Sequence, residues 1–210
     1  CIAYAAQKIY EQGLSNALVL PRGAASLPQL FAASELDAIT INFPTPQPKA
    51  KYAKKRLVHV NHLMLYRPLF VADATVTLRT DSKPLRDYAL GQFAAAGYDT
   101  LWVSDDVRHD HPEHPETEYE RRTREMGAAV YGICATPGAQ PSNEQLTAGR
   151  LQEQSLACYL PDNLDELTYV PLGMEEAVEN FRNRARKGKK RLPQESQGLL
   201  MVAASANKRK

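Results

Sequence analysis

The sequence predicts an α/β protein in which helices cover a layered β-sheet. Over residues 1–138, segments with apolar residues at helical spacing alternate with short segments rich in branched apolar residues, and glycines or prolines separate them. In sheets of this kind, ligands bind at the carboxyl ends of the strands. Polar residues that directly follow a predicted strand are therefore the first candidates for a functional site.

Apolar spacing and helix-ending residues define the first elements. Ile2, Ala5 and Ile9 share one helical face, and Gly13 is a natural stop, so the chain opens on a helix. The sequence then predicts a short buried strand at 17–20, a weak helix at 27–33, a strand at 38–43 and a helix at 59–70. Prolines at 44, 46 and 48 cannot extend a strand or nucleate a helix, so residues 44–56 are predicted to form a loop.

The same alternation continues in the second half of the domain. It predicts a strand at 74–79, a helix around 85–93 that Gly97 closes, a strand at 98–104, a polar loop at 105–116, a helix at 117–126 and a strand at 130–135. Thr45, Asp81 and the 105–116 loop all follow predicted strands. We therefore expect them at the ligand-binding edge of the sheet.

Composition and the chain's first residues restrict the class of protein. The 210 residues are 43% hydrophobic and 24% charged, which is ordinary for a globular chain, and no apolar run approaches membrane-spanning length, so no membrane partner is expected. The start at Cys1 has no methionine and no signal-like segment, so we expect a cytoplasmic protein truncated upstream. The three cysteines are odd in number, widely separated and form no CxxC pair, so neither a disulfide framework nor a zinc ribbon is indicated.

The net charge of +2 hides two basic blocks, one at 49–56 and one at 182–191, with an acidic stretch at 105–120 between them. Such blocks are typical of nucleic-acid contacts and equally of solvated faces or tails. For residues 49–56 the position after a strand and beside three prolines favours phosphate binding. The histidines of the acidic stretch, His109, His111 and His114, lack a rigid frame, so no metal is expected there.

Three segments in order resemble the signature motifs of the tRNA (guanine-N7)-methyltransferase family. They are residues 39–57, ITINFPTPQPKAKYAKKRL, then Leu78-Arg79-Thr80-Asp81, and then Thr117-Glu118-Tyr119-Glu120, which is similar to the family's Thr-x-x-Glu motif. The first motif departs from the family pattern, because Thr45 replaces an aspartate and Gln47 replaces a tryptophan. Ala24 likewise stands where the family has a cofactor-binding aspartate.

The resemblance implies a fold and an activity. The fold would be a Rossmann-like S-adenosylmethionine-dependent methyltransferase sheet whose first strands are missing from this chain. The activity would be methyl transfer from S-adenosylmethionine to N7 of a guanine in tRNA. The departures at Thr45, Gln47 and Ala24 leave open a tRNA-binding module that has lost methyl transfer. A metal-binding protein built on the histidine loop is a more distant alternative.

The resemblance also assigns roles to individual residues. It implies catalytic roles for Thr45 and Asp81, substrate contacts from Lys49, Asp81, Thr117, Glu118, Tyr119 and Glu120, cofactor contacts at Ala24 and Thr45, and RNA-backbone contacts from Lys51, Lys54, Lys55 and Arg56. Because methylation makes the guanine ring cationic, nearby carboxylates would stabilise that charge, and Asp81 and Glu120 are the candidates. The residues allow structural roles as well, since Thr117 and Glu120 have capping-box spacing and Asp81 has the position of a turn or helix N-cap residue.

The domain organisation follows a change in composition. Residues 1–138 are predicted to form the methyltransferase-like domain, incomplete at its N-terminus. Residues 139–191 are predicted to be a C-terminal extension with a helix at 174–186, and residues 192–210 a basic, disordered tail.

Overall fold

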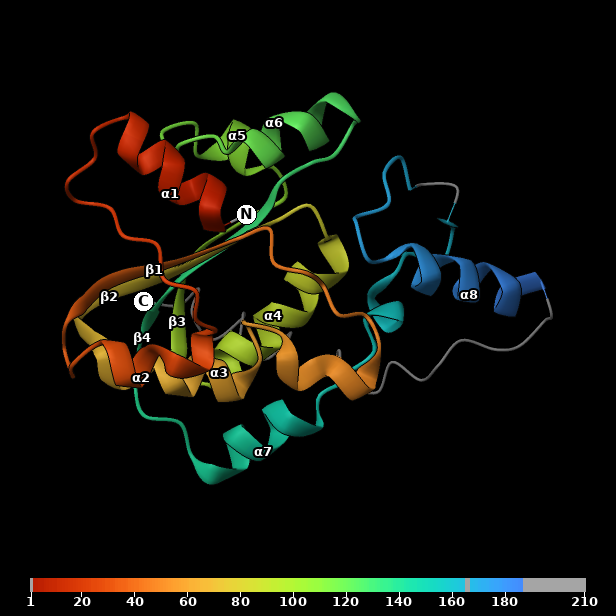
Figure 1. The fold of residues 1–210 in the computed structure, drawn as a ribbon. Helices are drawn as coiled ribbons and strands as arrows, with labels where there is room; N and C mark the ends of the chain where they lie inside the picture. Colours follow the sequence, from red (N-terminus) through yellow and green to blue (C-terminus); the bar gives the residue numbers. More distant parts are fainter. Residues whose placement is uncertain (1, 165–166, 187–210) are drawn as a thin grey trace.

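The computed structural model describes residues 2–164 and 167–186, and it contains one four-stranded mixed sheet (Figure 1). The strands are β1 (Leu36–Asn42), β2 (Phe70–Thr80), β3 (Tyr98–Ser104) and β4 (Tyr131–Pro137), in the spatial order β1-β2-β4-β3. β1 and β2 are parallel, whereas β4 runs antiparallel to both β2 and β3. The predicted α/β sheet is thus confirmed.

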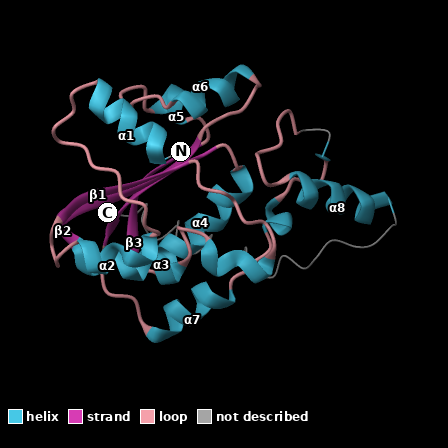
Figure 2. Ribbon diagram, viewed as in Figure 1, coloured by secondary structure: helices cyan, strands magenta, loops and turns pink. Residues whose placement is uncertain are grey.

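Helices lie on both faces of this sheet (Figure 2). One face carries α1 (Ile2–Glu11), α5 (Val107–Asp110) and α6 (Glu118–Glu125). The other carries α2 (Leu27–Leu30), α3 (Val60–Tyr66), α4 (Lys83–Ala95) and α7 (Asn143–Leu151), while α8 (Glu175–Arg186) lies beside the sheet. Short 3₁₀ helices connect these elements: η1 (Ala24–Ser26), η2 (Ala50–Lys55), η3 (Arg67–Leu69) and η4 (Leu156–Tyr159). None of the helices in the described residues is long and apolar enough to cross a membrane.

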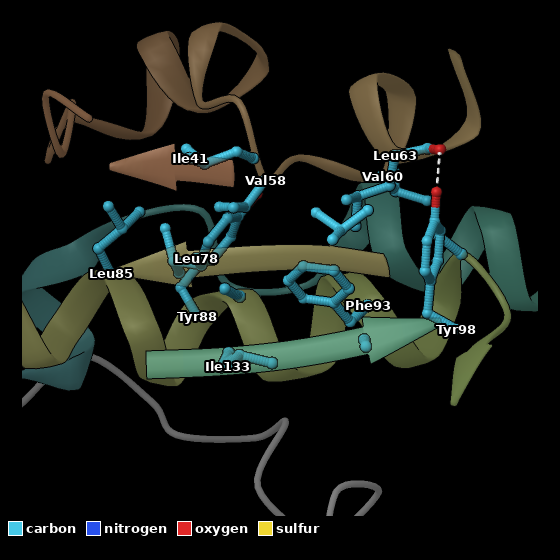
Figure 3. Close-up of a cluster of buried hydrophobic side chains, with 14 of the residues drawn as sticks. Ile41, Val58, Val60, Leu63, Leu78, Leu85, Tyr88, Phe93, Tyr98 and Ile133 are labelled. Atoms are coloured by element: carbon cyan, nitrogen blue, oxygen red, sulfur yellow. Dashed lines mark hydrogen bonds between the residues drawn. The ribbon is translucent and has the colours of Figure 1, made fainter. Parts of the chain in front are cut away.

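The main core lies between the sheet and the layer formed by α3 and α4 (Figure 3). Leu78 of β2 and Ile133 of β4 face Tyr88 and Phe93 of α4, and all four side chains are fully buried. Phe93 packs edge-on against Tyr98 with the ring centroids 5.5 Å apart. The Tyr98 hydroxyl donates to the Leu63 carbonyl over 2.8 Å, so its one polar group is satisfied inside the core.

Three sequence predictions need correction. Residues 17–20 are neither a strand nor buried, since Leu18 is 89% exposed and the segment pairs with no strand in the described part of the chain. A short apolar run forms a strand only where a neighbour completes its hydrogen bonds. Residues 44–56 were predicted to be a loop, but η2 occupies residues 50–55 of this range. The polar 105–116 loop contains α5, which Asp106 caps by accepting from the Arg108 amide.

The C-terminal extension packs onto the sheet domain. Its first helix, α7, was not predicted from the sequence, although Ser142 and Gln145 form a capping box at its start. Both α7 and η4 contact α4. The helix predicted at 174–186 is confirmed as α8, and the predicted tail at 192–210 lies outside the described residues.

Candidate active site

The candidate site begins where two parallel strands end side by side. Asn42, the last residue of β1, pairs with Arg79 near the end of β2. The Phe43 amide then donates to the Arg79 carbonyl over 2.8 Å, and Phe43 has a positive φ of 47° that turns the chain away from the sheet. This register places Thr45, two residues past Phe43, on the same edge as Asp81, as the sequence predicted.

Asp81 is the centre of a small polar cluster. Its carboxylate is only 8% exposed, and its Oδ2 accepts hydrogen bonds from the hydroxyls of Tyr119 at 3.1 Å and Tyr169 at 2.9 Å. Burial and then the Asp81 carboxylate raise the pKa of both tyrosines, so both hydroxyls stay protonated and keep donating. The Phe43 ring packs 5.0 Å from the Tyr119 ring, which links the end of β1 to this cluster.

Glu120, the second predicted carboxylate, has a different environment. It is fully buried between two arginines, Arg79 of β2 and Arg108 of α5, and the Arg108 Nη2 lies 2.9 Å from its Oε1. The same carboxylate closes the capping box with Thr117 at the start of α6. The predicted capping box is confirmed. Because the carboxylate is enclosed and its charge compensated, Glu120 has the geometry of a structural anchor.

The two arginines extend this anchor into the loop before α6. Arg79 donates to the Pro115 carbonyl over 2.8 Å, and Arg108 donates to the His114 carbonyl over 2.8 Å. The buried charges therefore hold the loop and α6 against the sheet. As a consequence Tyr119, the residue before Glu120, reaches Asp81.

Arg56 has a structural place as well. It is 1% exposed, its guanidinium lies 4.4 Å from the Tyr88 ring, and its Nη2 donates to the carbonyls of Gln47 at 2.7 Å and Gln154 at 2.6 Å. This side chain ties the proline turn, where Gln47 has a positive φ of 53°, to the C-terminal extension. The guanidinium is thus enclosed by the protein, out of reach of an RNA phosphate.

The lysines of the same basic run remain on the surface. Lys51, Lys54 and Lys55 are exposed. The amino groups of Lys51 and Lys55 lie 5.0 and 4.8 Å from the centroid of the Tyr52 ring. Lys49 is exposed too, but it forms a 2.8 Å ion pair with Glu176 of α8, which raises the lysine pKa. The free charge of the basic run is therefore concentrated on η2.

The remaining predicted site residues are less engaged. Thr117 caps α6, and Glu118 is exposed on its first turn. Thr45 is exposed beside the proline turn. Ala24 begins η1 and packs against the core, where its methyl group offers no hydrogen bond to a ligand.

A segment that the sequence analysis did not connect with the site covers it. We call residues 167–178 the covering segment. Tyr169 bonds Asp81, Glu176 pairs with Lys49, and Gly173 lies against the turn, since a Cβ there would be 3.8 Å from Thr45 Cγ2. No local pattern marked these residues, because the contact between Tyr169 and Asp81 joins residues 88 positions apart in the chain.

A cavity of about 120 Å³ lies beside Asp81, under the covering segment. Asp81, Lys83 and Tyr131 line it from the sheet domain, and Leu167, Tyr169 and Met174 line it from the covering segment. Its wall combines one carboxylate and one lysine with aromatic and apolar side chains. That combination suits a flat heterocycle with hydrogen-bond donors on one edge.

The histidine loop also gathers potential metal ligands. The ligand atoms of His111, Glu113 and His114 lie within 4.8 Å of one another, and Trp102 stacks on His111 with centroids 4.1 Å apart. The stack gives the loop more order than the sequence indicated. Glu113 is exposed and pairs with His111 at 3.3 Å, an arrangement that is common without a metal, so the expectation of no metal stays a prediction.

The mixed α/β sheet and a polar cluster at the carboxyl ends of its parallel strands place the protein among α/β proteins that bind ligands at this edge. Comparison with known proteins gives the family. The family described as putative methyltransferases matches residues 1–133, and the chain belongs to it. The match ends within β4, so the covering segment lies outside it.

Individual relatives agree with this assignment. The chain is 31% identical over 134 residues to a tRNA (guanine-N(7)-)-methyltransferase of Brevibacillus brevis, which is 63% of both chains. It is 33% identical over 131 residues to the protein of that name from Exiguobacterium sibiricum, covering 62% of both, and 30% identical over 136 residues to one from Streptococcus equi, covering 64% of both. The chain therefore spans a little under two thirds of the length of these relatives.

The buried charges generate the first prediction. Glu120→Gln keeps the shape of the side chain but leaves Arg79 and Arg108 without a countercharge, so the free energy of unfolding should fall by about 3–5 kcal/mol. Urea unfolding followed by circular dichroism measures this loss. The control is Glu118→Gln on the exposed face of α6, which should change stability by less than about 0.5 kcal/mol. Equal losses of unfolding free energy in the two variants would show that the buried ion pairs of Glu120 do not stabilise the fold more than an exposed glutamate does.

Proposed function

We propose that the protein is a tRNA (guanine-N7)-methyltransferase that uses S-adenosylmethionine as methyl donor. The observation that carries the proposal is the buried Asp81 carboxylate, held by two tyrosine hydroxyls beside a cavity and next to a surface of exposed lysines. The family and the names of the relatives support the same reaction class.

The chemistry asks little of the protein beyond positioning. Guanine N7 has an exposed lone pair, so no proton has to be removed before it attacks a methyl group. The ring then becomes cationic, and a fixed carboxylate close to it stabilises that charge better than water does. Asp81 is suited to accept hydrogen bonds from the N1 and N2 edge of the base, because in the described part of the chain its Oδ1 has no hydrogen-bond partner.

The cofactor side is less complete in the described residues. Of the two positions that the resemblance assigns to S-adenosylmethionine, Ala24 offers a methyl group and Thr45 a hydroxyl. Neither supplies the carboxylate that the family has at its position, so these two residues alone do not fit the cofactor. We therefore assign the described residues to recognition of the base and of the RNA, and we derive no step through the donor.

Binding of tRNA would place its phosphates on η2. Lys51, Lys54 and Lys55 are exposed on one short helix, and the Tyr52 ring between the first and last of them orders their side chains. Lysines so arranged bind phosphates without reading sequence. Arg56, although buried, supports this surface by fixing the turn that precedes it.

Methyl transfer to unmodified tRNA by the full-length gene product tests the proposed function directly. Incorporation of labelled methyl groups from S-adenosylmethionine into N7 of guanine is the expected result. Tight binding of tRNA without methyl transfer would instead identify a binding module, and absence of both would reject the proposal.

The second prediction concerns the RNA surface. Replacing Lys51, Lys54 and Lys55 with alanine should weaken tRNA binding and flatten the slope of log K against log salt by about 2–3 units, since each phosphate contact contributes about 0.7–0.9. The control removes three exposed cations elsewhere, Lys8, Arg182 and Arg184, and should leave the slope nearly unchanged. An unaltered slope in the η2 variant, with an intact circular dichroism spectrum, would remove η2 from the interface.

The third prediction concerns Thr45. If an aspartate at this position helps to orient the reactants, Thr45→Asp should raise the rate of methylation by about ten- to a hundredfold through one restored charge-assisted hydrogen bond. Initial rates of the full-length protein on unmodified tRNA measure the effect. Thr147→Asp adds the same charge on the exposed face of α7 and should leave the rate unchanged. A lower rate in Thr45→Asp would mean that the site is built around threonine.

A further inference from the structure

We infer that Tyr169, contributed by the covering segment, is a positioning residue for Asp81, and that residues 167–178 complete the pocket for the target base. This inference rests on the proposed function, because it assigns the base to the cavity beside Asp81. It concerns a part of the chain outside the family match, which ends at residue 133.

The covering segment meets the site at three separate points. Tyr169 donates to Asp81 over 2.9 Å, Glu176 pairs with Lys49 at 2.8 Å, and Gly173 lies against Thr45 and Pro46. Gly173 and Glu176 contact residues of the segment after β1, and Tyr169 contacts Asp81, the residue directly after β2. The segment is therefore placed over the site from the proline turn to the end of β2.

The segment is also tied to the hydrophobic core. Met174 is fully buried and Val178 is 3% exposed, and both belong to the core cluster that includes Tyr88 of α4. Apolar burial of this kind orders a segment more firmly than its exposed ion pair does. Tyr169 is thus held at a defined distance from Asp81 by packing a few residues away.

Two donors on one carboxylate oxygen fix the direction of the carboxylate. Tyr119 approaches from α6 and Tyr169 from the covering segment, and both use Oδ2, which leaves Oδ1 for a ligand. A carboxylate with a single donor could rotate about its Cβ–Cγ bond, since this terminal torsion is broad. The second tyrosine restricts that rotation and so keeps the free oxygen aimed in one direction.

The cavity formed in this way suits a purine with donors on its Watson–Crick edge. It is about 120 Å³ in volume, and Leu167, Tyr169 and Met174 of the covering segment line it together with Asp81, Lys83 and Tyr131 of the sheet domain. Guanine presents N1–H and the N2 amino group to a carboxylate, whereas inosine base presents N1–H alone. Discrimination between the two bases therefore reports how well Asp81 is aimed.

The test combines a variant with a change in the base. Wild-type protein should bind tRNA carrying the target guanosine about tenfold more tightly than the same tRNA with inosine at that position, because one hydrogen bond to a carboxylate is lost. Tyr169→Phe removes only the hydroxyl and should reduce this preference to about threefold or less, with the urea unfolding midpoint close to that of the wild type. Equilibrium binding with both tRNAs gives the two ratios.

Tyr159→Phe is the matched control. Its hydroxyl accepts from Gln152 at 2.8 Å and donates to the Glu153 carbonyl at 3.3 Å, away from Asp81, so its loss should leave the preference for guanosine at the wild-type value. If Tyr169→Phe behaves as Tyr159→Phe does while the wild type prefers guanosine, the inference fails and the proposed function stands. If the wild type neither methylates tRNA nor prefers guanosine, both fail.

A measurement on the wild-type chain covers the case in which Tyr169→Phe does not fold. Hydroxyl-radical oxidation of tyrosine side chains, which does not depend on their ionisation, is mapped by mass spectrometry with and without saturating unmodified tRNA. Bound tRNA should reduce oxidation of Tyr169 by about tenfold, as expected for a group enclosed by a ligand, and leave Tyr159 unaffected. Equal oxidation of Tyr169 in the two samples would overturn the inference.

Discussion

The geometry of the site depends on one buried carboxylate, Glu120, set between Arg79 and Arg108. A charge in such a place is tolerated only when it is paired, so the strand, the loop and α6 that supply the three side chains have to be in register at the same time. Tyr119 is adjacent to Glu120 in the chain and reaches Asp81 from there. The Glu120 ion pairs thus fix Tyr119 relative to β2, and Tyr119 in turn holds the Asp81 carboxylate.

The separation of structural and functional charge is a second consequence. Of the two acidic side chains that the sequence offered for stabilising a cationic guanine, Glu120 is neutralised inside the protein, whereas among the described residues Asp81 accepts only from neutral tyrosine hydroxyls. A carboxylate without a paired cation can stabilise positive charge on a ligand, whereas the charge of one between two guanidinium groups is already compensated. The same division exists among the cations, where Arg56 shapes the turn and the lysines of η2 face solvent.

Local patterns predicted most of the fold and part of the site. β3 has the predicted bounds of 98–104, and α6 begins at the predicted capping box, because both are determined by alternation or capping within a few residues. The strand predicted at 17–20 failed since pairing requires a distant partner. The same limit applies to the site: Glu120 meets Arg79 across 41 residues, and Tyr169 meets Asp81 across 88, so no short window contains either contact.

The central claim, that Asp81 receives the guanine that is methylated, is tested most directly by nucleoside mass spectrometry of unmodified tRNA incubated with the full-length gene product and S-adenosylmethionine. We expect 7-methylguanosine with the wild type, little with Asp81→Asn, and wild-type amounts with Asp37→Asn on the exposed face of β1. Undiminished 7-methylguanosine with folded Asp81→Asn would contradict this role of Asp81.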